Sequence, residues 1–364
     1  MANSMWIVVA ATATAVSVIV TGVWRILLWP ARISPKKMSA ERLGFRVSDG
    51  ADKASVDGVC RAFAMGFNTM ISHPSAERWK AVCNGISPMY RPFAHEGAAM
   101  GHPVRAVGRF SPELFESDIV CTNTEFAYLH YVGLGFWSAM RNHSPLRMAA
   151  VVNKLDPLLG PLFWDGYGFK HGFFDFAATS SYTRKFEQLD GYARHVAYQG
   201  LGRSLWFRFM DDVDALIGAI RSFGLYAPDT AAGLGLAAVF ATADRPHRGL
   251  AVVERLPRAW HADALLGMCF GYKARARCDE AYFAEMLTAL DVSRVRAIRA
   301  AIAQCDVIEA RVRCDGGVDG YRRWRGELRD WLVANVSYPF SALRGDETKN
   351  ASDPVTVRAA RAAG

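Results

Sequence analysis

Apolar and polar residues follow the period of an α-helix along most of this chain. In the segment 212–223, Val213, Leu216 and Ile220 have the i, i+3 and i+7 spacing that places side chains on one helix face. Alternating runs typical of half-buried strands are few and short. The chain is therefore predicted to be all-α. The same pattern predicts helices at 55–72, 75–84, 124–141, 147–159, 192–207, 229–241, 259–277, 279–290 and 292–304.

Glycine recurs along the predicted helices at a nearly constant interval. The recurring residues are Gly66, Gly97, Gly133, Gly166, Gly200, Gly233 and Gly267, a period close to 34 residues. Such a period is typical of tandem helical pairs. Glycine costs about 1 kcal/mol relative to alanine inside a helix, so its repetition at one register needs a reason. Close approach of two helix backbones supplies one. We therefore predict tandem antiparallel helix pairs that form a curved stack or ring.

The N-terminal segment is a candidate membrane span. Residues 2–24 carry no charged side chain, and the nineteen residues 5–23 would span roughly 28 Å as a helix. Basic residues follow at once, which predicts a single pass with the body facing the cytoplasm. The alternative is a helix that packs on its own domain. The expected organisation is a transmembrane anchor (1–29), a linker (30–50), a helical-repeat body (51–340) and a flexible tail (341–364).

Composition narrows the possible partners and cofactors. The net charge of +8 does not require nucleic acid as a partner, because most basic residues are interspersed with acidic ones. A surface that favours anionic lipid is the simpler interpretation. The seven cysteines are scattered without a C-x-x-C pair, which argues against a zinc ribbon and a disulfide scaffold. Motifs for phosphate-loop, nucleophile-elbow, zinc-protease and dinucleotide-binding sites are absent from the sequence.

Two glycine segments carry a carboxylate and a histidine at matching positions. Glu96 and His102 form one pair, and Asp165 and His171 form the other, with each histidine six positions after its acid. Carboxylates and imidazoles can bind a divalent metal or perform acid–base chemistry. Positions i and i+6 lie about 120° apart on a helix, so each acid and its histidine would not share one face. The alternative is that these groups satisfy helix ends and interhelix hydrogen bonds. The candidate catalytic residues are Glu96, Asp165 and His171.

Aromatic and polar residues gather near the second segment. Tyr167, Tyr198, Gln199, Arg203 and Trp206 are candidate substrate-binding residues, because such a mixture can line a pocket for an extended apolar ligand with a polar head. The same mixture is also typical of a half-polar interface between helices, and the sequence does not separate the two interpretations.

A cluster of aspartates begins the next helix. Asp211, Asp212 and Asp214 would suit Mg²⁺ bound to a diphosphate, as aspartate-rich helical motifs do in class I terpene synthases. The second metal motif of those enzymes is absent. The favoured alternative is a helix cap that complements the helix dipole.

The segments 165–174 and 191–206 resemble the hallmark segments of the UnbL-type family of bacterial proteins. Weaker likeness occurs at 42–47 and 95–101, and the resemblance covers roughly residues 39–332. Members occur with enediyne-type polyketide synthase cassettes and related secondary-metabolite clusters. The resemblance thus implies a pathway context rather than a reaction. The apolar N-terminus and the aspartate cluster depart from the family.

Two functions remain open at this point. One is a membrane-associated cyclase or lyase of natural-product biosynthesis that acts on a hydrophobic polyene or isoprenoid chain. The other is a non-catalytic helical-repeat scaffold or carrier for a hydrophobic intermediate or a partner biosynthetic enzyme. A deep apolar cavity with converging acids and histidine would favour the enzyme. A shallow, charged concave surface would favour the scaffold.

Overall fold

The computed structural model describes residues 28, 31–45, 47, 50–72, 76–106, 108–210, 212–317 and 319–344. Over these residues the named elements are all helices, which confirms the predicted all-α class, and one isolated bridge joins Val336 to Leu343. Seven helices carry the recurring glycines: α2 (Gly50–Ser72), α4 (Arg91–Arg105), α6 (Ala127–Met140), α8 (Leu162–Phe174), α10 (Tyr192–Phe209), α12 (Ala227–Phe240) and α14 (His261–Cys278).

Shorter helices lie between and after these seven, which we call the ring helices. They are α3 (Ala76–Asn84), α5 (Pro112–Phe115), α7 (Pro145–Val152), α9 (Thr179–Glu187), α11 (Val213–Ser222), α13 (Pro246–Val253) and α15 (Glu280–Leu287). Single turns are η2 (Pro35–Lys37), η3 (Glu116–Val120), η4 (Thr124–Phe126), η5 (Phe176–Ala178), η6 (Gly224–Tyr226) and η7 (Arg258–Trp260). A final pair, α16 (Val292–Asp315) and α17 (Gly320–Asn335), completes the described chain.

The recurring glycines are the points at which neighbouring ring helices touch. A Cβ atom added to any of the seven would lie only 1.7–2.2 Å from a carbonyl oxygen of the next or preceding ring helix. For Gly166 of α8 that oxygen belongs to Val132 of α6, and for Gly200 of α10 it belongs to Asp165 of α8. No other residue type fits these contacts, so the prediction of close backbone approach is confirmed.

The helices in contact at the glycines are parallel. Gly97 of α4 faces Phe63 of α2, and Gly101 faces Phe67, so the same separation of 34 residues is kept over a full turn. Antiparallel helices would bring a later residue against an earlier one instead. The glycine contacts therefore join parallel helices of successive repeats, and they do not test the predicted antiparallel pairing of two helices within one repeat. The segment that carries each short helix returns the chain to the start of the next ring helix.

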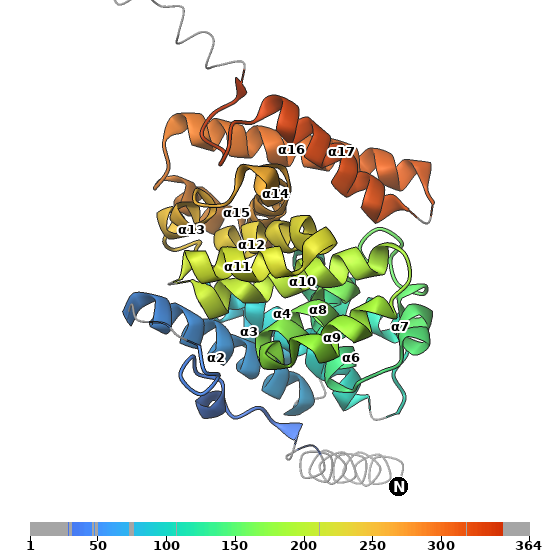
Figure 1. Ribbon diagram of the computed structural model, residues 1–364. Coiled ribbons are helices and arrows are strands. Elements are labelled where there is room, and N and C mark those ends of the chain that lie inside the picture. The colour runs from blue at the N-terminus through green and yellow to red at the C-terminus, as the bar shows by residue number, and fades with distance from the viewer. Residues whose placement is uncertain are drawn as a thin grey trace, which may run out of the picture.

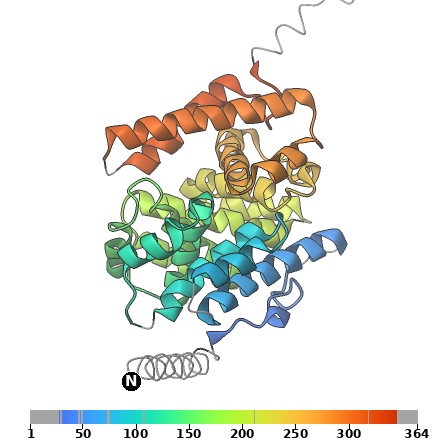
Figure 2. The ribbon, with the colours of Figure 1, turned by 180° about the vertical axis from the view of Figure 1, so that it is seen from behind.

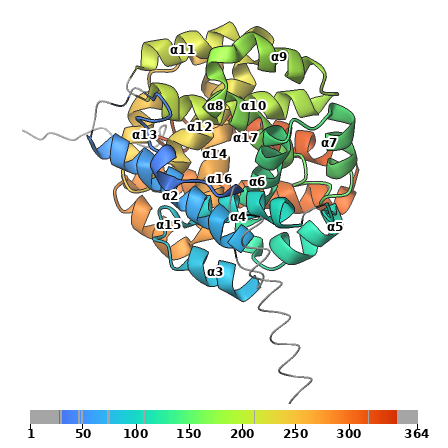
Figure 3. The same cartoon turned by 90° about the horizontal axis from the view of Figure 1, so that it is seen from below.

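The ring helices follow one another around a centre when the molecule is viewed end on (Figure 3). The end of α14 meets the start of α4, where Arg275 donates to the Met89 carbonyl at 3.0 Å and Arg91 pairs with Asp279 at 3.1 Å. The pair α16–α17 covers one end of this ring, and the described residues 31–45 lie at the opposite end (Figures 1 and 2).

Residues 31–45, here called the N-terminal arm, pack against the ring. The Asn68 amide exchanges two hydrogen bonds, of 2.9 and 2.7 Å, with the backbone of Ile33. The Phe45 ring meets Phe173 of α8 edge-on at 4.8 Å. The arm belongs to the segment that we expected to be a linker, and these contacts fix it on α2 and α8.

The predicted membrane anchor and tail fall mostly outside the described residues. Residues 1–27, 29, 30 and 345–364 are not among them. Within the part of the chain that the structure describes, no helix combines the length and the apolar character needed to cross a bilayer.

Candidate functional site

The repeated glycine register also determines which side chains face the centre of the ring. Three positions on each ring helix share one face: the residue before the glycine, the third residue after it and the seventh residue after it. They are spaced four residues apart, about one helical turn. One position before the glycine lie Glu96, Val132, Asp165 and Gln199; three after it lie Phe136, Phe169, Arg203, Leu236 and Phe270; seven after it lie Phe173, Phe207, Phe240 and Ala274. All of these side chains line one or both of two interior cavities.

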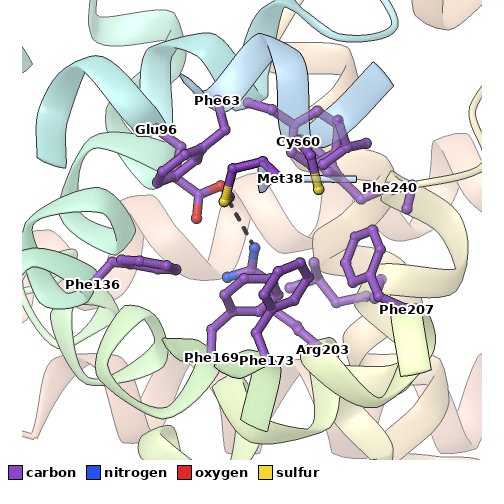
Figure 4. A pocket seen from close by; sticks show the side chains of 15 residues that line it. Met38, Cys60, Phe63, Glu96, Phe136, Phe169, Phe173, Arg203, Phe207 and Phe240 are labelled. Atoms are coloured by element: carbon purple, nitrogen blue, oxygen red, sulfur yellow. Dashed lines mark ion pairs between the residues drawn. The ribbon is translucent and has the colours of Figure 1, made fainter. Parts of the chain in front are cut away.

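A buried charge cluster occupies the centre. Arg203 of α10 forms an ion pair and hydrogen bond with Asp165 of α8, and its Nη2 lies 3.9 Å from Oε2 of Glu96 on α4 (Figure 4). The Gln199 amide donates to the second Asp165 oxygen at 2.7 Å. All four residues are at least 94% buried. One cation thus faces two acids inside an otherwise apolar ring.

The two charged partners respond to this environment in different ways. Burial raises the pKa of Glu96 to about 7, although the charge of Arg203 opposes the rise. Burial disfavours the Arg203 cation, but Asp165 and Glu96 outweigh it and raise the Arg203 pKa above its usual range. Arg203 is therefore a permanent charge, whereas Glu96 can hold or release a proton near neutral pH.

The first cavity, called the lower cavity, lies between this cluster and the N-terminal arm. Its volume is about 40 Å³, and a water molecule needs roughly 10–15 Å³ on the same scale. Glu96 and Arg203 are its charged lining residues, and Met38 of the arm lies among its aromatic side chains (Figure 4). Its phenylalanines are Phe63, Phe93, Phe136, Phe169, Phe173, Phe207 and Phe240.

The second cavity, called the upper cavity, lies toward α17. It measures about 50 Å³ and is lined by Asp165, Gln199 and Arg203 together with Tyr321 and Trp324 of α17. Three residues line both cavities: Arg203, Leu236 and Phe240. The charge cluster therefore lies between two apolar spaces.

The position of Glu96 makes stability depend on pH. The folded pKa of about 7 exceeds the usual 4.5, so between these values the folded protein keeps a proton that the unfolded chain releases. The contribution of Glu96 to the free energy of unfolding is fully present below pH 4.5 and is lost as the pH rises through about 7. We expect the free energy of unfolding to fall over this window by on the order of 3 kcal/mol more in the wild type than in Glu96→Gln. Urea titrations of both proteins across pH 4.5–8 measure this difference, and parallel curves would contradict it.

His171 does not join the two acids. Its Nδ1 atom lies 2.8 Å from Oδ2 of Asp175, at the end of α8, and its ring packs beside Tyr167 and Tyr182. Burial first, and then the charge of Lys170, lowers its pKa to about 4. His171 lies six positions after Asp165 on the helix, so it points away from the ring centre, as the helical angle predicted. The matching His102 lies 3.3 Å from Asp118 outside the cavities.

The three aromatic candidates fill contacts outside the cavities. The Tyr167 ring meets His171 edge-on at 4.9 Å, and Tyr198 stacks on Tyr226 at 4.2 Å. Trp206 is fully buried beneath the Arg248 guanidinium, 6.0 Å from its ring centre. Four of the eight candidate catalytic and substrate-binding residues therefore converge: Glu96, Asp165, Gln199 and Arg203.

The aspartate cluster has the geometry of a helix start. Asp212 caps α11 by accepting a hydrogen bond from the Ala215 amide at 2.9 Å, and exposed Asp214 pairs with Arg255 at 2.9 Å. Asp211 is outside the described residues. Over the described ranges, no group of three or more His, Cys, Asp or Glu side chains is arranged to hold a metal ion. The partners of Asp212 and Asp214 agree with the cap, and we derive no metal-dependent step from this cluster.

Comparison with protein families gives a family but no activity. Residues 23–332 match the family described as a protein of unknown function, DUF1702, and the chain belongs to that family. No curated protein and no solved structure matches the chain.

Proposed function

We propose that the ring encloses a hydrophobic polyene or isoprenoid chain and that Glu96 supplies the proton that starts its cyclisation. The observation that carries this proposal is a carboxylic acid with a pKa of about 7 in the wall of a cavity with seven phenylalanines. Enclosed apolar space with two converging acids meets part of the criterion that favours an enzyme over a scaffold, while the expected histidine, His171, lies outside this space. The natural-product context implied by the sequence resemblance agrees with such a substrate.

The proposed reaction conserves atoms and electrons without a further reactant. A carbon–carbon double bond of the substrate takes the Glu96 proton, so a C–H bond forms while the O–H bond breaks. The cation left on the other carbon is attacked by a second double bond, which closes a ring. Loss of a proton from the cyclic cation to the Glu96 carboxylate restores a double bond and regenerates the acid. The product is an isomer of the substrate.

The lining residues have distinct roles in this scheme. The phenylalanine faces would stabilise the migrating cation and exclude water that would quench it. Arg203 would stabilise the Glu96 carboxylate that exists between the two proton transfers, since its guanidinium lies 3.9 Å away. Asp165 accepts a hydrogen bond from the guanidinium and holds it in place, and the Gln199 amide donates to the other Asp165 oxygen. Asp165 and Gln199 are therefore positioning residues.

The cavity must enlarge to admit such a chain. At about 40 Å³ the lower cavity holds a few water molecules rather than an isoprenoid. Met38 is the lining residue supplied by the arm rather than by the ring helices, and its unbranched side chain can change conformation at low cost. Withdrawal of Met38 would enlarge the lower cavity on the side that faces the arm.

The test combines substrate feeding with deuterium labelling. Full-length protein in lipid vesicles is incubated in deuterium oxide with a set of isoprenoid hydrocarbons and alcohols, and extracts are analysed by mass spectrometry. A cyclic product that has gained solvent deuterium is expected from the wild type. Glu96→Gln should reduce its yield at least about a hundredfold, since a positioned general acid contributes about 10²–10⁴-fold.

The matched control is Glu116→Gln. Glu116 is a half-buried glutamate whose pKa is also raised, first by burial, but it binds the Tyr131 hydroxyl at 2.8 Å outside both cavities. This variant should retain the wild-type yield. Equal yields from the wild type and Glu96→Gln would overturn the acid role. Tight binding of the isoprenoids without conversion would favour the carrier function instead.

A further inference from the structure

Basic side chains gather on the exposed surface of the N-terminal arm. Lys36 and Lys37 end the turn η2, and Arg42 follows, all three exposed. Glu41 is the acidic residue of the arm, and it faces Lys53 of α2 at 3.8 Å. The described arm thus presents an excess of positive charge at one end of the ring. At the same end, Met38 of the arm lines the lower cavity.

Apolar side chains are exposed at the same end. Phe174 ends α8 and is 37% exposed, and Met140 ends α6 and is 51% exposed. Because α6 and α8 are parallel, their C-terminal ends lie together, and Phe173 contacts Phe45 of the arm there. A surface that combines basic and apolar side chains is typical of protein regions that lie on anionic lipid.

The sequence before the arm points to the same partner. Residues 2–24 carry no charged side chain, and the chain reaches the arm within a few residues of this apolar run. A polybasic segment and an apolar segment together provide the two signals that stable membrane attachment needs.

We propose that this end of the ring docks on an anionic lipid bilayer and that the hydrophobic substrate enters the lower cavity directly from the bilayer beside Met38. This inference deepens the proposed function, on which the choice of substrate rests. Docking itself does not require the chemistry of Glu96. An apolar chain would then pass from lipid to phenylalanine-lined space without crossing water, which would otherwise oppose its transfer.

The experiment places a polarity-sensitive fluorophore at each end of the ring in the full chain. The exposed cysteines Cys121 and Cys314 are changed to serine, and the label is attached through Ser34→Cys in the arm or Gly326→Cys in α17. Vesicles contain phosphatidylcholine with or without phosphatidylglycerol. We expect a blue shift of the Ser34→Cys label with the anionic vesicles and no shift of the Gly326→Cys label.

Charge removal tests the residues that carry the docking. The variant K36Q/K37Q/R42Q should bind anionic vesicles about a hundredfold more weakly, because each basic residue near the surface contributes about 1 kcal/mol and 1.4 kcal/mol is a tenfold change. The control R299Q/R311Q/R323Q removes the same charge from α16 and α17, at the covered opposite end, and should bind as the wild type does.

The outcomes separate docking from catalysis. Equal shifts with neutral and anionic vesicles, shifts of both labels, or equal affinities for the two charge variants would each overturn the docking proposal. Glu96→Gln should show the wild-type shift of the Ser34→Cys label even if its product is lost. A protein that docks without forming a cyclic product would leave the docking proposal intact and contradict the proposed function.

Discussion

Replacing Gly166 with alanine is expected to lower the free energy of unfolding by about 2 kcal/mol or more. The new Cβ would lie 1.8 Å from the Val132 carbonyl oxygen, so α8 and α6 would have to separate. Overpacking of an interior costs about 1–3 kcal/mol, and backbone atoms yield less readily than side chains. The higher helix propensity of alanine returns about 1 kcal/mol at most. Urea denaturation of the full chain measures the change.

The matched control is Gly218→Ala in α11. An added Cβ at Gly218 meets no atom within 4 Å, and the residue is exposed. Only the helix propensity acts there, so this variant should be more stable than the wild type by up to about 1 kcal/mol. If the Gly166 and Gly218 variants were equally stable, the ring helices could not be in backbone contact at Gly166.

The glycine spacing shows why the ring was partly predictable. The backbones of neighbouring helices touch at Gly97 and Gly200, so no side chain fits at these positions. The need for glycine at each contact is therefore visible in the sequence as a repeated residue. The direction of the helices is not recorded in this way. A contact between glycines is equally possible for parallel and antiparallel helices, and the register of 34 residues over a full turn appears only in the structure.

Two ring helices escape prediction from hydrophobic periodicity. Leu162–Phe174 contains three glycines and no alanine, so its intrinsic helix propensity is low. Arg91–Arg105 has prolines near its start and inside its last turn. Both are helical because tertiary packing of their glycine faces outweighs local propensity. Periodicity alone therefore underestimates the number of repeats.

The charge cluster was predictable for the same reason as the ring. Glu96, Asp165 and Gln199 precede a recurring glycine by one position, and Arg203 follows one by three, so the repeat brings them to one centre. Five of the seven lining phenylalanines obey the same register, which is the signal that would have identified them: Phe136, Phe169, Phe173, Phe207 and Phe240. Met38 and Tyr321 lie outside the repeat, and no periodic signal in the sequence places them at the cavities.

Replacing Arg203 with methionine is expected to lower the free energy of unfolding by about 3–5 kcal/mol, the usual cost of leaving a buried charge without its partner. Asp165 is 1% exposed and would lose its ion pair, while Glu96 would lose the charge that opposes the rise of its pKa. The folded pKa of Glu96 would rise further, so the loss of stability should grow as the pH increases from 5 to 8. Urea denaturation at both pH values measures this.

A second substitution distinguishes charge from packing. The variant R203M/D165N removes the uncompensated aspartate charge, and the asparagine Oδ1 can still accept from the Gln199 amide. It should be more stable than R203M at neutral pH although it carries one more substitution, because a neutral buried amide costs less than an unpaired buried carboxylate. If the double variant were the less stable of the two, the loss in R203M would come from lost packing of Arg203 against Phe169, 5.0 Å from its guanidinium, rather than from charge.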